Sequence, residues 1–81
     1  MTIPQHIKFH RELLRLTQKQ LAEAMGKPRL QAQICHYEHG NFKPSKKNVD
    51  LLDKTFLKLM TEGVIGLSKG MEHYQPLSSL T

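Results

Sequence analysis

Apolar residues recur through the first sixty positions at the three- and four-residue spacing typical of amphipathic helices. They form four stripes separated by polar turns. In chain order these comprise Ile3, Ile7, Phe9, Leu13, Leu14 and Leu16; Leu21, Ala22 and Met25; Leu30, Ile34 and Tyr37; and Val49, Leu52, Phe56, Leu59 and Met60. No useful length before residue 63 alternates with a period of two, so the sequence predicts an all-α fold.

Residues that favour helix starts precede three of the stripes. Thr2 can cap a first helix that has Pro4 in its opening turn, where the missing N–H costs little. Thr17 and Gln20 have the spacing of a capping box, and Ser45 is a good N-cap for the last helix. These signals set the expected helix starts.

Glycines mark the expected helix ends. Gly26, Gly40 and Gly63 each follow a stripe, at the position where a left-handed residue ends a helix. The third helix is therefore expected to begin between Pro28 and Gln31 and to end at Gly40.

The pattern weakens after Gly63. We expect residues 1–63 to form the domain and residues 64–81 to form an extension. Within it, Val64–Met71 either caps the core or makes a dimer contact, and we favour a dimer contact made together with the end of the fourth helix. The Ser-rich end that opens at Pro76 is expected to be frayed.

Positive charge is concentrated in one part of this 81-residue chain, whose net charge is +5. Residues 27–47 contain five cations and a single acid, Glu38, a balance of +4. A concentrated basic patch favours a polyanionic partner, most often nucleic acid, although a merely solvated face is the simpler alternative. The five cations are Lys27, Arg29, Lys43, Lys46 and Lys47.

Cysteine content and hydropathy bear on the compartment. A single cysteine, Cys35, excludes an intrachain disulfide framework and suits a reducing cytosol. No apolar run approaches the roughly 18 residues that span a bilayer, and the N-terminus lacks a signal-peptide apolar region. We expect a cytoplasmic protein without a membrane partner.

The second and third predicted helices are short and joined by a turn at Gly26, which matches the helix-turn-helix plan. In that plan the second helix of the pair enters the DNA major groove. Gln and Arg offer the paired hydrogen bonds that adenine and guanine edges require, and a thiol or methyl can pack against a thymine methyl. The candidate base-reading residues are Arg29, Gln31, Ala32, Gln33, Cys35 and His36.

Phosphate contacts are expected from neighbouring residues. Gln18 lies in the first turn of the second helix, where free N–H groups and the helix dipole favour an anion, and lysines follow the reading helix. The candidate backbone-contacting residues are Gln18, Lys19, Lys27, Lys43, Lys46 and Lys47.

The segment from about Ile7 to Phe56 resembles the lambda-repressor-like helix-turn-helix family, also called the Cro/C1 or XRE type. Its marks are Leu-Thr-Gln-x-x-Leu-Ala-Glu at residues 16–23, Ile-x-x-Tyr-Glu-x-Gly at residues 34–40, and Pro44-Ser45. The resemblance implies a compact bundle of four to five helices and sequence-specific DNA binding, usually as a dimer on a pseudo-palindromic operator. It also implies that Gln18 contacts the DNA backbone and that Gln31, Ala32, Gln33 and His36 face the groove.

The chain departs from the family pattern at the turn. Ile34 follows Gly26 by eight residues, two more than is usual in the family, and the extra residues fall within 27–30. Either the turn is longer, which we favour because Glu38 and Gly40 keep their usual distance from Ile34, or the reading helix begins early with Pro28 at its first position.

Other chemistry is less well supported. His6 with His10 and Cys35 with His39 have the i, i+4 spacing of metal ligands, but no nearby second pair completes a site. We expect no metal, cofactor or enzymatic activity, keep oxidation of Cys35 as an alternative role, and expect Glu38 to pair with Arg15 or Arg11.

Two functions from different classes follow. The first is a small transcription regulator, expected to be a repressor or autoregulator, that binds operator DNA as a homodimer and is associated with the nucleoid. We expect no small-molecule ligand, because only a short stretch of the given sequence follows the helix-turn-helix. The alternative is a helical protein-interaction module, such as an antitoxin-like or adaptor protein, that keeps the fold without reading DNA.

Overall fold

The computed structural model describes residues 1–62 and 74–80, which are helical throughout their regular parts and include no strand. The elements are α1 (Ile3–Leu13), α2 (Gln18–Ala24), the 3-10 turn η1 (Pro28–Leu30), α3 (Gln31–Glu38), α4 (Lys46–Glu62) and the 3-10 turn η2 (Leu77–Leu80). The predicted all-α class is confirmed for this part of the chain. The expected stop at Gly63 and the Val64–Met71 stretch lie outside the described residues.

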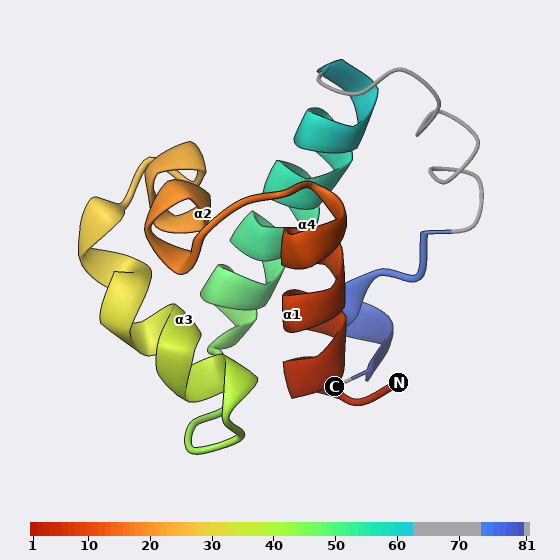
Figure 1. Cartoon of the computed structure of the whole chain (residues 1–81). Helices are drawn as coiled ribbons and strands as arrows, with labels where there is room; N and C mark the ends of the chain where they lie inside the picture. The colour runs from red at the N-terminus through yellow and green to blue at the C-terminus, as the bar shows by residue number, and fades with distance from the viewer. Residues whose placement is uncertain (63–73, 81) are drawn as a thin grey trace.

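Side chains of α1, α2, α3 and α4 meet in one core, and in Figure 1 α4 is seen between α1 and the α2–α3 pair. α3 contacts both α1 and α2, while η2 packs against α4 and α1. The buried apolar side chains form one core, to which every described element except η1 contributes. Its members are Ile7, Leu14, Leu21, Ala22, Met25, Ile34, Tyr37, Val49, Leu52, Phe56, Met60 and Leu77.

The predicted helix starts at Thr2, Thr17 and Ser45 and the left-handed stops at Gly26 and Gly40 are confirmed. Thr2 and Thr17 each form a capping box with the Gln three residues later, so α1 and α2 begin with satisfied N–H groups. Ser45 accepts a hydrogen bond from the N–H of Asn48 at 3.3 Å at the start of α4. Gly26 and Gly40 have φ of +75° and +77°, the left-handed conformation that glycine adopts without steric cost.

The inward face of α1 differs from the prediction. Phe9 and Leu13 are 52% and 42% exposed, whereas His6 and His10 are buried beside Ile7 and therefore replace them in the core. The spacing of apolar residues did not predict this face, because backbone carbonyl groups supply hydrogen-bond partners that allow the two imidazoles to be buried. His10 Nδ1 lies 2.9 Å from the carbonyl oxygen of His6, and His6 Nε2 lies 2.8 Å from that of Gln75.

The described part of the C-terminal extension is docked, not frayed as expected. Leu77 is fully buried, and the Asp53 carboxylate on α4 holds this segment in place. It accepts hydrogen bonds from the Tyr74 hydroxyl at 2.6 Å, the Leu77 N–H at 2.6 Å and the Ser78 N–H at 3.1 Å. Burial and the hydrogen bond to Asp53 raise the pKa of Tyr74, so its hydroxyl stays a donor.

A buried ion pair fixes α3 against α1. The Nε and Nη2 of Arg11 donate to the two carboxylate oxygens of Glu38 at 2.6 and 3.0 Å, and the Arg11 Nη1 donates to the carbonyl oxygen of Leu16 at 2.7 Å. The side chains are only 14% and 5% exposed. This pairing confirms the structural role expected for Glu38, with Arg11 as its partner. It also raises the pKa of Arg11.

We expect Glu38→Gln to lower the free energy of unfolding by about 2–3 kcal/mol, because a neutral amide leaves the buried Arg11 charge without its counterion. Urea unfolding measures this loss. Glu23→Gln is the matched control, since Glu23 is an exposed acid on the adjacent helix, and it should change stability by less than about 0.5 kcal/mol. Equal losses in the two variants would contradict a buried ion pair.

A second prediction concerns pH. Burial lowers the pKa of His6 from its ordinary value of 6.5; the hydrogen bond to the Gln75 carbonyl opposes this shift, His10 adds to it, and Asp53 opposes it. Below pH 6.5 the unfolded chain takes up a proton that the folded chain does not, so acidification favours unfolding. We expect stability to fall below that pH by at most about 1.4 kcal/mol per pH unit.

His6→Gln retains a donor for the Gln75 carbonyl but does not titrate. Thermal unfolding of this variant between about pH 7.5 and 5.5 should therefore depend less on pH than that of the natural chain. Parallel curves for the two proteins would show that His6 does not cause the acid sensitivity.

Candidate nucleic-acid interface

One side of α3 is anchored and the others are exposed. Ile34 and Tyr37 are buried and Leu30 packs against the core at the entry to the helix, so the predicted inward stripe is confirmed. A helix of eight residues is marginal by itself, and this packing supplies its stability. The outward side chains of the first turn, Gln31, Ala32 and Gln33, are all exposed.

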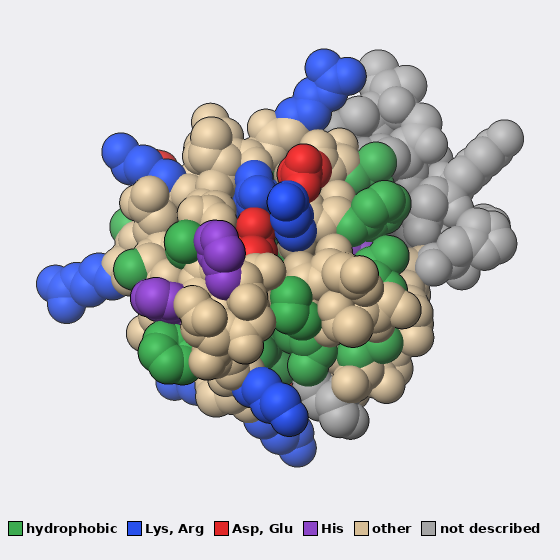
Figure 2. All heavy atoms as spheres, turned by 60° about the horizontal axis from the view of Figure 1, so that its bottom comes forward, with side chains coloured by type: hydrophobic (Ala, Val, Ile, Leu, Met, Phe, Trp, Pro, Cys, Tyr) green, Lys and Arg blue, Asp and Glu red, His purple; other side chains and the backbone are tan. Residues whose placement is uncertain are grey.

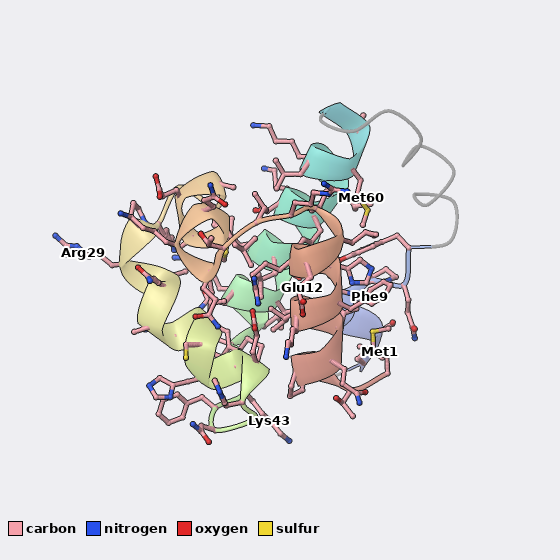
Figure 3. The ribbon with its side chains drawn as sticks, viewed as in Figure 1. Met1, Phe9, Glu12, Arg29, Lys43 and Met60 are labelled. Atoms are coloured by element: carbon pink, nitrogen blue, oxygen red, sulfur yellow. The ribbon has the colours of Figure 1, made fainter. Side chains whose placement is uncertain are left out.

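The two extra residues near the turn are accommodated by a 3-10 turn. After Gly26, Lys27 leads into η1, which has Pro28 in its first turn and runs directly into α3 at Gln31. The α-helix itself thus begins where the longer-turn hypothesis requires, while helical structure of the tighter kind begins at Pro28. Arg29 projects from η1 and is exposed (Figure 3).

Several of the predicted residues lie together in a shallow recess on the α2 side of α3. In this recess the proposed base-reading residues at the start of α3 lie close to Gln18 at the start of α2. It is lined by Gln18, Pro28, Arg29, Gln31, Ala32 and Cys35. Hydrogen-bonding side chains and a small apolar surface are therefore adjacent here, as contacts to a base edge require.

A second recess lies on the other side of α3, between that helix and the start of α4. It is lined by Gln33, Tyr37, Phe42, Lys43, Ser45 and Asn48. A hydrogen-bond chain crosses it: Asn48 Nδ2 donates to the Tyr37 hydroxyl at 3.0 Å, and that hydroxyl donates to Gln33 Oε1 at 3.1 Å. Gln33 is thus separated from Gln31 and oriented by its own partners.

Phe42 and Asn48 were missed by the sequence reasoning. Phe42 is 57% exposed, and its ring centroid lies 4.9 Å from that of His36. Asn48 lies four residues before Leu52, on the inward stripe of α4. Asn48 could have been noticed as a polar residue at a position where the helix spacing calls for a buried apolar one. The sequence offers no comparable indication for Phe42.

His36 and Cys35 make local contacts. His36 is half-buried between Phe42 and Asn41, whose Nδ2 lies 3.3 Å from His36 Nδ1. Cys35 Sγ lies 3.6 Å from Nδ1 of His39, which is also 2.7 Å from the Cys35 carbonyl oxygen. Among residues 1–62 and 74–80, no group of three or more His, Cys, Asp or Glu side chains is arranged to hold a metal ion.

Gln18 is placed differently from the other predicted contacts. It is half-buried, and its Nε2 donates to Glu38 Oε1 at 3.3 Å, so the side chain is tied to the ion pair that anchors α3. It nevertheless lines the α2-side recess, next to Arg29 and Gln31.

The basic residues surround α3 but do not form one cluster. Lys19, Lys27, Lys43, Lys46 and Lys47 are all exposed, and Arg29 and Lys43 lie near opposite ends of α3 (Figure 3). Lys46 instead lines a recess with Pro44, Asp50 and Ser78, beside the C-terminal segment. Figure 2 shows Lys and Arg side chains projecting at separate points around the edge of the view, with others near its centre beside acidic side chains.

Two further findings complete the description. No helix in the described ranges is long and apolar enough to cross a membrane. Comparisons of the chain with protein-family models, with curated proteins and with solved structures find no match, so the functional assignment depends on the chemistry of the molecule itself.

Proposed function

We propose that this protein is a sequence-specific DNA-binding transcription regulator of the lambda-repressor-like, Cro/C1 type. In this proposal α2 and α3 form the helix-turn-helix, and the protein acts as a repressor or autoregulator. The observation that carries it is the composition of the exposed side of α3. Amide side chains occupy its first turn, cations flank both of its ends, and its acid, Glu38, is turned inward and neutralised by Arg11.

The charge arrangement supports a polyanionic partner. An exposed carboxylate on α3 would repel phosphate, but Glu38, the last residue of the helix, is 5% exposed and bonded to Arg11 through both of its oxygens. The exposed cations Lys27 and Lys43 are therefore not offset by that acid. A helix flanked in this way suits a position between two phosphate backbones.

The side chains of the first turn of α3 support base reading. Gln31 and Gln33 are exposed, and each carries a donor and an acceptor that can bond a base edge. Arg29 is suited to guanine, and Ala32 beside Cys35 gives a small apolar surface for a thymine methyl group. We assign base reading to these residues and to His36, and backbone contacts to Lys19, Lys27, Lys43 and Lys47 with Gln18 in support.

We propose a homodimer on a pseudo-palindromic operator. One domain of this size contacts little DNA, and specific protein–DNA interfaces generally bury more surface than a single short helix supplies. A two-fold protein pair on two half-sites solves this problem. The Val64–Met71 stretch expected to make the dimer contact lies outside the described residues.

One observation favours the alternative, a protein-interaction module. Phe9 and Leu13 are exposed and lie one turn apart on α1, so they form an apolar pair of the kind that partner proteins bind. This pair is also compatible with a DNA-binding protein that has a protein partner. Direct measurement of DNA binding separates the two functions.

We expect Gln31→Ala to relax the preference for one base pair, with a loss of about 1–3 kcal/mol against the best site and little change on random duplex. Lys43→Ala should instead weaken binding to all sequences and reduce the slope of log K against log salt by about 0.9. Fluorescence anisotropy at several salt concentrations measures both effects. Lys58→Ala, which removes an exposed lysine from α4, is the matched control and should leave the slope unchanged.

Selection from a random DNA pool tests the proposal as a whole. The winning sequences should contain two related half-sites in inverted orientation, with their centres about one helical turn apart. If the chain binds the best selected site no more tightly than random duplex, the regulator hypothesis is wrong and the interaction module becomes the better account.

A further inference from the structure

We propose that Asn48 on α4 is a specificity-determining residue that acts through Tyr37 to fix which end of the Gln33 amide is presented to a base. This inference rests on the proposed function and deepens it. It assigns a role to the hydrogen-bond chain in the recess between α3 and α4, a different recess from the one that Gln31 lines.

The hydrogen bonds of this chain all run one way, from Asn48 to Tyr37 to Gln33, because the phenol in the middle has a single hydrogen to donate. Tyr37 has one O–H hydrogen, which it donates to Gln33 Oε1 at 3.1 Å, and its oxygen accepts from Asn48 Nδ2 at 3.0 Å. The Tyr37 side chain is 4% exposed and packed in the core, so its hydroxyl has a fixed position. If one neighbour of the hydroxyl is a donor, as Asn48 is, the other neighbour must therefore be an acceptor.

The direction of the chain determines what Gln33 offers outward. Its carbonyl oxygen is held by Tyr37, so the Nε2 group, with two N–H donors, is the end left for an external ligand. Guanine presents two acceptors, O6 and N7, in the major groove, whereas adenine presents one acceptor and one donor. The geometry thus points to an acceptor-rich guanine edge opposite Gln33, rather than the adenine that an unconstrained glutamine prefers.

Asn48 controls this choice because its side chain is the donor that begins the chain. An aspartate at this position has only acceptor atoms, so Tyr37 would donate to it and turn a lone pair toward Gln33. Gln33 would then reverse, donating Nε2 to Tyr37 and presenting Oε1 outward. An outward acceptor favours bases with an exocyclic amino donor, adenine or cytosine.

The test is selection and affinity measurement on the full chain with Asn48→Asp. At the base pair whose preference Gln33→Ala relaxes, the natural chain should prefer guanine. Asn48→Asp should shift this preference by about tenfold toward adenine or cytosine, which corresponds to one good hydrogen bond gained or lost. Other positions of the site should keep their preferences.

Ser45→Asp is the matched charge control. Ser45 lines the same recess and caps α4, a role that Asp fills equally well, but no hydrogen bond joins it to Tyr37. It should weaken all sequences through its charge and leave the base preference unchanged. Tyr37→Phe removes the hydroxyl, frees Gln33 to adopt either orientation, and should bring guanine and adenine to within about twofold of each other.

A measurement without DNA separates this inference from the proposed function. By NMR, both Nε2 protons of Gln33 should exchange with water as freely as those of an exposed amide in the natural chain. One of them should be protected in Asn48→Asp, because it then donates to Tyr37.

The outcomes are distinguishable. If the natural protein has no preferred DNA sequence, the proposed function fails, while the NMR result still decides the direction of the Asn48–Tyr37–Gln33 hydrogen bonds. If the natural chain is specific but Asn48→Asp has the same base preference as Ser45→Asp, the role of Asn48 is overturned. Should Asn48→Asp not fold, an unaltered guanine preference in Tyr37→Phe overturns it equally.

Discussion

The paired charges of Arg11 and Glu38 are the constraint on which the placement of α3 depends. Separating the two buried charges would leave each without a counterion, which is unfavourable, so the ends of α1 and α3 are held in one relative position. The same guanidinium bonds the Leu16 carbonyl and the same carboxylate accepts from Gln18, which extends the constraint to the start of α2. Because an eight-residue helix is not stable alone, these contacts and the buried Ile34 and Tyr37 are what make α3 a rigid element.

Those features that depend on neighbours in sequence were predictable. The N-cap at Thr2, the capping box at Thr17 and the left-handed stops at Gly26 and Gly40 each involve groups within a few residues, so their spacing specifies them. The exposed first turn of α3 follows equally from the apolar stripe of that helix, because fixing its inward face leaves the remaining side chains outside. The sequence therefore located the outer face of α3 correctly, although what that face binds remains a proposal.

Features that depend on distant residues were not predictable. His6 is buried because a carbonyl 69 residues away accepts from its ring, and the C-terminal segment docks because Asp53 bonds three groups 21 to 25 residues further on. An isolated reading of α1 assigns histidines to the surface and Phe9 to the core, and here the long-range contacts reverse both. The hydrogen bonds that join Asn48, Tyr37 and Gln33 were not predicted for the same reason, since they connect residues of different helices.

In a chain of 81 residues the groups that hold the core also orient the outer surface. Tyr37 packs its ring in the core while its hydroxyl holds Gln33, and Glu38 neutralises Arg11 while it holds Gln18. The two amides are thus held by different elements: Gln33 through Tyr37 by Asn48 of α4, and Gln18 of α2 by the Arg11–Glu38 pair. Because the supports are separate, a change in one recess can alter the chemistry presented there without moving the other, as long as the ion pair keeps α3 in place.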